Sequence, residues 1–359
     1  MKYHIIYICV LAQLLLFAGC NDMYDVPHSI IWNDSIQAPR LLVLCEGLFN
    51  MNNSTLAMVN NADSTVDYNV FLTKNGRGLG DTANDMKRYG GKIYITVNVS
   101  SQLEVIDANT LTSIKQIPLF NESGVSRQPR CVAFYKEKAF VSCFDGFVAV
   151  IDTASLEIEQ FISCGRNPDQ LAVSNGKLYV SNSGGLDFPF YDSTVSVIDL
   201  SCYKEIKRIE VGLNPGSIGS DSQNDIYVIS RGDYSEYQLH KIDTEIDTVV
   251  STFKNIHPLN MKIVNDIAYM YSVDYNTKEY WIKQFDCITD DVINEQFVSD
   301  GTDIRTPYGI EVDSRNGDVY ICEAYDYVVW GDLLCFNRFG KLKFRLDGIG
   351  LNPNNILIY

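Results

Sequence analysis

From about residue 40 onward, short runs of β-branched and aromatic residues recur along the chain, separated by polar turns. The clearest recurring feature is a strand-like run that ends in Asp or Asn. Seven such marks occur, and their central residues stand 43 to 51 positions apart. They are "MVN" at Met58, "VID" at Val105, Val150 and Val197, "KID" at Lys241, "QFD" at Gln284 and "CFN" at Cys335. This period is typical of a four-stranded blade, so the sequence predicts seven blades.

The other strands of each unit have their own signals. A turn that carries Pro opens the unit and leads into an apolar strand, as in "QPRCVAF", "NPDQLAV" and "TPYGIEV". A tight polar turn follows, and then a second strand of β-branched and aromatic residues, as in "KLYVSN" and "DIYVIS". The marked strand is the third, and runs such as "IKRIEVG" supply the fourth.

The two ends of this region predict how the repeat closes. The final "LNPNNILIY" has the Pro turn and apolar strand of an opening unit, whereas "RLLVLCEG" near Arg40 is a second strand without a first. The last strand is therefore expected to complete the first blade, which removes exposed sheet edges. The predicted fold class is all-β, a seven-bladed β-propeller in which the C-terminal strand closes the first blade.

The N-terminal residues predict export. Residues 1–19 have a basic head at Lys2 and an apolar run too short to span a bilayer, as in a signal peptide. The segment ends in "FAGC", which resembles a bacterial lipobox, so Cys20 is the predicted lipidation site. An ordinary secretory signal is the alternative. Residues 20–38 are predicted to form a tether, and residues 39–359 the propeller.

Composition narrows the possible partners. The formal net charge is −16, which disfavours nucleic acid because phosphate backbones require clustered Lys and Arg. Several cysteines lie inside strand-like runs, among them Cys45, Cys143 and Cys322. We expect free core thiols there, with a bridge between Cys131 and Cys143 as the alternative.

One face of the predicted ring carries variable loops. Turns from first to second strands are uniformly short, whereas the loops from second to third strands vary and share the other face with the connections between blades. From Ser181 to Asp199 the chain takes 18 steps, but the equivalent path from Ser142 to Asp152 takes 10. Binding usually resides in such variable loops on a fixed scaffold. Several of them are long and aromatic, so they are expected to surround the channel mouth.

These motifs carry a family resemblance over nearly the whole mature chain. Runs such as "VSVID" and "GKLYVSN" resemble YncE-like propellers. Runs such as "CEGLFNMNNSTL", "LGDTANDM" and "GRNPDQLAVSNGKLYVSNSGGLDFPFYDSTVSVIDL" are similar to the BtuG-type surface lipoproteins of gut bacteria. The resemblance implies a non-enzymatic protein that binds cobalamin or a related corrinoid and works with the TonB-dependent outer-membrane transporter BtuB. It also implies an outer-membrane location at the cell surface, with membrane contact through the lipid anchor only and no cofactor besides the bound ligand. Asp22 and Asp25 after Cys20 agree with surface export, and the periplasmic face is the alternative.

The candidate ligand-binding residues come from the loops and strand ends of the variable face. Aromatic groups offer contact area at little entropic cost, Asn exchanges hydrogen bonds with amides, and Arg166 or Arg231 could meet a phosphate. About half of the aromatic groups are expected only to pack loops. The candidates are Phe49, Asn52, Asn84, Arg130, Phe144, Arg166, Asp169, Asn182, Phe188, Tyr191, Arg231, Tyr234, Tyr275, Tyr325, Tyr327 and Trp330.

Two other functions are consistent with the sequence. Glu46, Asn84, Asp169 and Asn182 carry the oxygen ligands that calcium prefers, and some propellers are calcium-dependent hydrolases or lactonases. No nucleophile motif accompanies them. A scaffold that binds another protein or a glycan would use the same exposed aromatic groups. The lone His257 is interpreted as a surface residue rather than a cobalt ligand.

Overall fold

The computed structural model describes residues 32–33, 40–60, 65–234, 236–274 and 277–359. The chain divides into two compact units, Met1–Trp32 and Asn33–Tyr359, and the second is described below. The predicted signal peptide and Cys20 lie outside the described residues, as does the predicted tether apart from residues 32–33. Within the described part of the chain, no helix has the length and apolar character needed to cross a membrane.

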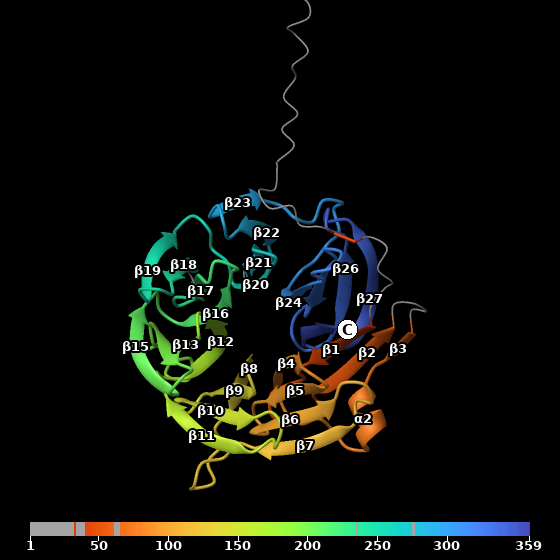
Figure 1. The fold of residues 1–359 in the computed structure, drawn as a ribbon. Helices are drawn as coiled ribbons and strands as arrows, with labels where there is room; N and C mark the ends of the chain where they lie inside the picture. The colour runs from red at the N-terminus through yellow and green to blue at the C-terminus, as the bar shows by residue number, and fades with distance from the viewer. Residues whose placement is uncertain (1–31, 34–39, 61–64, 235, 275–276) are drawn as a thin grey trace, which may run out of the picture. The chain divides into compact units, whose positions relative to one another are not determined.

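The second unit is a ring of seven four-stranded antiparallel sheets around a central channel (Figure 1). Blade 1 contains β28 (Pro353–Ile358), β1 (Arg40–Cys45), β2 (Thr55–Asn60) and β3 (Thr65–Asp67), and blade 2 contains β4 (Ala83–Tyr89), β5 (Lys92–Val97), β6 (Gln102–Asp107) and β7 (Ser113–Pro118). Blade 3 contains β8 (Pro129–Tyr135), β9 (Lys138–Cys143), β10 (Phe147–Asp152) and β11 (Ile158–Ser163), and blade 4 contains β12 (Pro168–Ser174), β13 (Lys177–Asn182), β14 (Thr194–Asp199) and β15 (Lys204–Glu210). Blade 5 contains β16 (Pro215–Ser220), β17 (Ile226–Ser230), β18 (Gln238–Asp243) and β19 (Thr248–Phe253), and blade 6 contains β20 (Asn260–Val264), β21 (Ile267–Val273), β22 (Tyr280–Asp286) and β23 (Asp291–Asn294). Blade 7 contains β24 (Pro307–Val312), β25 (Val319–Glu323), β26 (Trp330–Phe336) and β27 (Leu342–Leu351), and the short helix α2 (Val70–Asn75) joins blade 1 to blade 2.

The second strand of each blade is buried because a neighbouring blade covers each of its faces. In β13, Leu178 and Val180 pack with residues of blade 3, whereas Tyr179 between them packs with residues of blade 5. A strand buried on both faces is apolar at successive positions instead of alternating. This explains the apolar and aromatic second-strand runs in the sequence, and it places the core between blades.

The predicted marks are the ends of the third strands. Asp107 ends β6, and its Oδ1 accepts hydrogen bonds from the backbone N–H groups of Asn109 (2.9 Å) and Thr110 (2.8 Å). These bonds hold the pKa of the Asp107 carboxyl below its ordinary value. Asp152 and Asp199 cap their turns in the same way. Asp is thus selected at this position because its side chain closes the turn.

The prediction that the C-terminal strand closes blade 1 is confirmed. β28 pairs with β1 on the channel side of the sheet, and Figure 1 shows the C-terminus beside β1. The N–H of Arg40 donates to the carbonyl of Tyr359 (3.1 Å), and the reverse bond is 3.0 Å. In the other blades a hairpin turn joins these two strands. Here noncovalent contacts between the two ends replace that turn.

Eight cysteines lie among the described residues, and all eight carry free thiols. Six are buried, Cys131 is half-buried and Cys202 is exposed. The alternative of a bridge between Cys131 and Cys143 is therefore wrong. Cys143 pairs with Pro129 in the β8–β9 register, and Cys131 lies at the register shift between Pro129 and Val132.

Ile356 tests the closure of the ring. Its side chain is 3% exposed and packs between blades 1 and 7. Ile356→Ala removes apolar contacts at the joint, so we expect unfolding by urea to show a loss of about 2–4 kcal/mol. The control is Ile206→Ala on the outer strand β15, where the side chain is 53% exposed and the change should stay within about 0.5 kcal/mol. Equal losses for the two variants would contradict the account of closure.

The burial of His240 leads us to expect a loss of stability in mild acid. It lies inside blade 5 between the hydroxyls of Ser230 (2.8 Å) and Thr252 (3.0 Å), and burial lowers its pKa to about 4. The unfolded chain takes up this proton near pH 6.5 and the folded chain near pH 4, so this stabilisation declines as the pH falls between these values. Between pH 7 and pH 4.5, the free energy of unfolding of wild type, measured in urea, should fall by about 2 kcal/mol more than that of His240→Gln. A difference independent of pH would contradict the assignment.

Candidate binding site at the channel mouth

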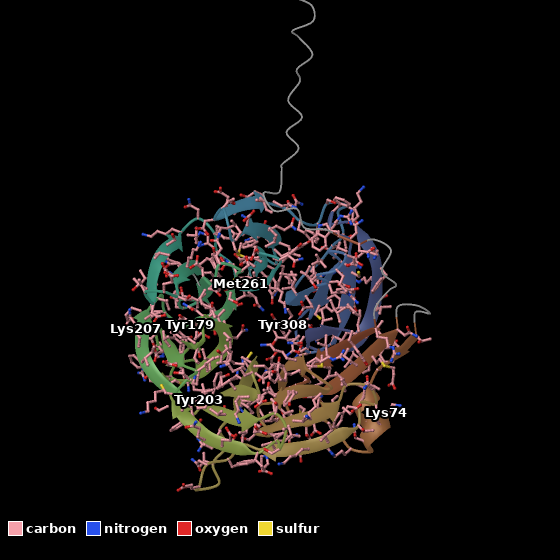
Figure 2. The ribbon with its side chains drawn as sticks, viewed as in Figure 1. Lys74, Tyr179, Tyr203, Lys207, Met261 and Tyr308 are labelled. Atoms are coloured by element: carbon pink, nitrogen blue, oxygen red, sulfur yellow. The ribbon has the colours of Figure 1, made fainter. Side chains whose placement is uncertain are left out.

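The mouth of the channel lies on the face that carries the variable loops. Inner strands begin at this face, next to the loops that join second and third strands. A cavity of about 540 Å³ is lined by inner-strand residues from all seven blades, together with Glu46, Arg231 and Tyr234 from two of the loops. Figure 2 shows Tyr308 at the inner side of the ring, next to the channel. The volume is within the range of small-molecule sites.

A repeated position in the sequence supplies the side chains at the mouth. The residue that follows the Pro of an opening turn lies at the start of the inner strand and lines the cavity. Arg130, Asp169, Tyr308 and Asn354 occupy this position in blades 3, 4, 7 and 1. Asn84 occupies it in blade 2, where Ala83 replaces the Pro.

These side chains form a continuous hydrogen-bonded chain around the mouth. Glu46 accepts from the hydroxyl of Tyr308 (2.6 Å) and from Nδ2 of Asn84 (2.7 Å). Arg130 donates from Nη1 to Oδ1 of Asn84 (2.7 Å) and from Nε to Oδ1 of Asp169 (3.2 Å). Arg231 donates to Oδ2 of Asp169. The chain links six blades, which fixes the orientation of its polar groups.

Arg231 reaches the mouth from a loop because its neighbour has no side chain. Gly216 occupies the repeated position in blade 5, and a Cβ atom there would lie 1.9 Å from Nη2 of Arg231. Any larger residue would displace the guanidinium group. Because Gly216 has no side chain, the guanidinium group of Arg231 lies in the space that a side chain at position 216 would fill.

The acidic and basic groups of the mouth stabilise one another. Burial alone would raise the pKa of the Asp169 carboxyl, but the Arg130 and Arg231 guanidinium groups outweigh it and hold the pKa below its ordinary value. Burial, with the carboxylate of Glu46 beside the ring, raises the pKa of Tyr308 well above its ordinary value. Asp169 is thus ionised and Tyr308 protonated at neutral pH.

Aromatic side chains surround the polar mouth. The guanidinium carbon of Arg130 lies 4.7 Å from the ring centre of Phe144, and the rings of Tyr308 and Tyr327 are 5.3 Å apart. On the side of blades 4 and 5, Tyr191 lies between two further rings, with centroid distances of 6.0 Å to Phe188 and 6.2 Å to Tyr234. We call Phe188, Tyr191 and Tyr234 the aromatic row. Phe188 is 74% exposed and Tyr234 49% exposed, so the row offers free ring surface beside the mouth.

The extra loop of blade 4 is held by Arg166. Its Nη1 contacts Oδ2 of Asp187 (2.7 Å) and the carbonyl of Phe190 (2.9 Å), and Nη2 donates to the carbonyl of Tyr191 (3.0 Å). Arg166 therefore positions the aromatic row and is not among the residues that line the cavity. Its guanidinium group is engaged by the loop, and its contact with a phosphate stays a prediction.

Five other candidates are not among the residues that line the cavity. Asn182 is buried inside blade 4, where Nδ2 bonds the hydroxyls of Thr194 and Ser196 (both 2.9 Å). The hydroxyl of Tyr325 contacts Asp332 and Arg345 within blade 7. Trp330 lies 6.1 Å from Tyr68 near the joint of blades 7 and 1. The exposed Phe49 and Asn52 belong to the loop of blade 1, in which the N–H of Asn52 donates to Asp81 (2.9 Å).

Two predicted positions concern the loops of blades 5 and 6. Tyr275 lies outside the described residues. His257 is exposed and its Nδ1 contacts the carbonyl of Tyr237 (2.9 Å). His257 is not among the residues that line the cavity, which agrees with its interpretation as a surface residue.

The four residues considered for calcium do not converge. Asn182 is buried with its Nδ2 bonded to Thr194 and Ser196, and Arg130 lies between Asn84 and Asp169 with hydrogen bonds to both. A cation that needed both side chains would have to displace this guanidinium group. This bonding does not favour a calcium site built from these four residues.

Sequence reasoning missed several residues of the mouth. Tyr308 and Asn354 were not candidates, although both follow the Pro of an opening unit, in "TPYGIEV" and "LNPNNILIY". Glu46 was considered only as a calcium ligand. The position after the Pro was the signal that could have found the first two.

The sequence matches a known family over most of the propeller. The family described as "Domain of unknown function (DUF5074)" matches residues 41–338. The chain belongs to the DUF5074 family. No curated protein matches the sequence.

Solved structures similar to this DUF5074 chain support its fold. A quinonprotein alcohol dehydrogenase-like protein from Bacteroides thetaiotaomicron is 17% identical with a TM-score of 0.64, over 89% of this chain and 78% of that chain. A functionally unknown protein from Desulfotomaculum acetoxidans is 12% identical with a TM-score of 0.62, over 90% of this chain and 99% of the other. Dihydro-heme d1 dehydrogenase NirN is 12% identical with a TM-score of 0.58, over 90% of this chain and 76% of that chain. At these identities the likeness concerns the fold alone.

Asp169 tests the polar mouth of the DUF5074 propeller. Asp169→Asn removes the carboxylate that separates two guanidinium groups, so we expect a loss of about 3 kcal/mol in urea unfolding. The matched control is Asp187→Asn, which breaks an ion pair whose two side chains are both 49% exposed and should cost less than about 1 kcal/mol. Losses of the same size would show that the mouth is not a buried ionic network.

Proposed function

We propose that this chain is a cell-surface lipoprotein that captures cobalamin or a related corrinoid. It passes the ligand to a BtuB-like, TonB-dependent transporter of the outer membrane. It acts as a binding protein without a catalytic step, and the corrinoid is its ligand rather than a cofactor. The lipid on Cys20 is its attachment to the membrane, at the cell surface.

The sequence supports this proposal through its motifs. The lipobox-like "FAGC" and the resemblance of the loops of blades 1 and 4 to BtuG-type lipoproteins point to the same class of protein. The formal charge of −16 agrees with a partner other than nucleic acid.

The observation that carries the proposal is the aromatic row beside a polar mouth. A corrinoid is a broad, rigid macrocycle with apolar faces and carboxamides at its edge. Exposed rings such as Phe188 and Tyr234 suit the apolar face, and the polar chain from Tyr308 to Arg231 suits the edge. Because the polar chain is held by hydrogen bonds before any ligand arrives, binding requires little reordering of these side chains.

Calorimetric titration tests the function. The chain from Asn21 onward should bind cyanocobalamin in a one-to-one complex. Replacing Phe188, Tyr191 and Tyr234 together with Ala removes the aromatic row, and we expect at least about a hundredfold loss of affinity because anchoring aromatic groups dominate such contacts. Unchanged affinity would place the ligand elsewhere.

The control for this titration is Phe339→Ala. Phe339 is 65% exposed in the turn between β26 and β27, on the face opposite to the mouth. Its loss should leave the affinity unchanged. Wild-type protein that released no heat and gained no thermal stability with cyanocobalamin would refute the proposed function and favour a protein or glycan as the partner.

A further inference from the structure

The cavity at the channel mouth is electrically balanced, in contrast to the chain as a whole. Its lining includes four acidic residues and four basic residues, whereas the chain has a formal charge of −16. The acidic residues are Glu46, Asp85, Asp169 and Glu311, and the basic residues are Lys87, Arg130, Arg231 and Lys262. The formal charges of the lining therefore cancel, although the chain as a whole is acidic.

Every carboxylate oxygen of this lining already accepts a hydrogen bond. Both oxygens of Glu46 and both of Asp169 are used by the mouth. Deeper in the channel, Asp85 accepts from Asn355 Nδ2 (2.9 Å) and from the N–H of Val132 (2.9 Å). Glu311 accepts from Lys262 Nζ (2.6 Å) and from the N–H of Val312 (3.0 Å). A ligand cation would therefore compete with a donor already bound to each carboxylate oxygen.

The basic groups are occupied in the same way. Arg130 and Arg231 share Asp169, and Lys262 pairs with Glu311. Lys87 donates to the carbonyl of Val132 (2.7 Å) and lies 3.5 Å from Asp85. An anionic ligand group would therefore compete with a carboxylate or a carbonyl for each cation, at a cost in desolvation.

Two residues that line the cavity each have a buried polar atom without a hydrogen-bond partner, and the two atoms are of complementary kinds. Among the described residues, Oδ1 of Asn354 is a buried acceptor without a donor, and Nε of Arg231 is a buried donor without an acceptor. Both residues line the cavity. Leaving such groups unpaired costs free energy, so a ligand group that could both donate and accept would be favoured.

We infer that the channel mouth binds neutral carboxamide groups and discriminates against carboxylates and ammonium groups. An amide carbonyl suits the guanidinium N–H, and an amide NH₂ suits the Asn354 oxygen. This inference rests on the proposed function and specifies how the ligand is held. The carboxamide arms of the corrinoid enter the mouth, while the macrocycle lies on the aromatic row. The phosphate of a nucleotide arm stays outside.

Small probes test the inference without a corrinoid. Saturation-transfer NMR is recorded with propionamide, propionate, propylammonium and propanol, which share a carbon chain and differ in the terminal group. We expect saturable binding of propionamide with a dissociation constant on the order of 10 mM, and at least about tenfold weaker binding of the other three. Equal binding of propionate or propanol, or no saturable binding of propionamide up to about 100 mM, would overturn the inference.

A charge-changing variant sharpens the test. Arg231→Met frees one oxygen of Asp169 and leaves the lining with one excess negative charge, so it should weaken propionamide binding and admit propylammonium. The control is Arg208→Met, because Arg208 pairs with Glu205 on the outer strand β15. Thermal unfolding confirms that both variants are folded. A variant at position 231 with the selectivity of wild type would also overturn the inference.

The inference and the proposed function can fail separately. Binding of cyanocobalamin without a preference for propionamide would leave the function intact and refute the role of the mouth. A preference for propionamide without binding of cyanocobalamin would support the amide site and refute the corrinoid as its ligand.

Discussion

The structure depends on the burial of each second strand between two neighbouring blades. Leu178 and Tyr179 are adjacent in β13, yet they pack in different cores on opposite sides of blade 4. A single blade therefore cannot bury its own apolar residues, and each blade needs neighbours on both sides. A ring is the arrangement that meets this need without exposed ends. The pairing of β28 with β1 completes it by joining the two ends of the propeller.

Closure of the ring determines where function can reside. The inner strands bring one residue from each blade to the same end of the channel, and the loops between second and third strands rise around them. Charged residues at this buried position require partners. The chain from Tyr308 to Arg231 supplies these partners, so the mouth is rigid and balanced although the chain is acidic. Rigidity and balance are the properties on which the proposed recognition of a neutral, amide-rich ligand is based.

The sequence was sufficient to predict the architecture, because a 43- to 51-residue period and a strand without its partner at each end are both visible in it. The site was less accessible. Whether a polar side chain binds a ligand or holds a loop depends on its neighbours in space. Arg166 and Arg231 look equivalent in the sequence, but the first holds the loop of blade 4 and the second replaces the missing side chain of Gly216. Asn182 and Tyr325 bond within their own blades, which no local pattern indicates.

Hydrogen exchange followed by mass spectrometry, with and without cyanocobalamin, tests the central claim that the loop face of this propeller holds a corrinoid. The account predicts slower exchange in residues 183–193 and 231–234, which carry the aromatic row and Arg231, and at the starts of β8 and β12. Turns on the opposite face, such as residues 153–157, should exchange at an unchanged rate. Unchanged exchange throughout, or slower exchange confined to the opposite face, would contradict the account.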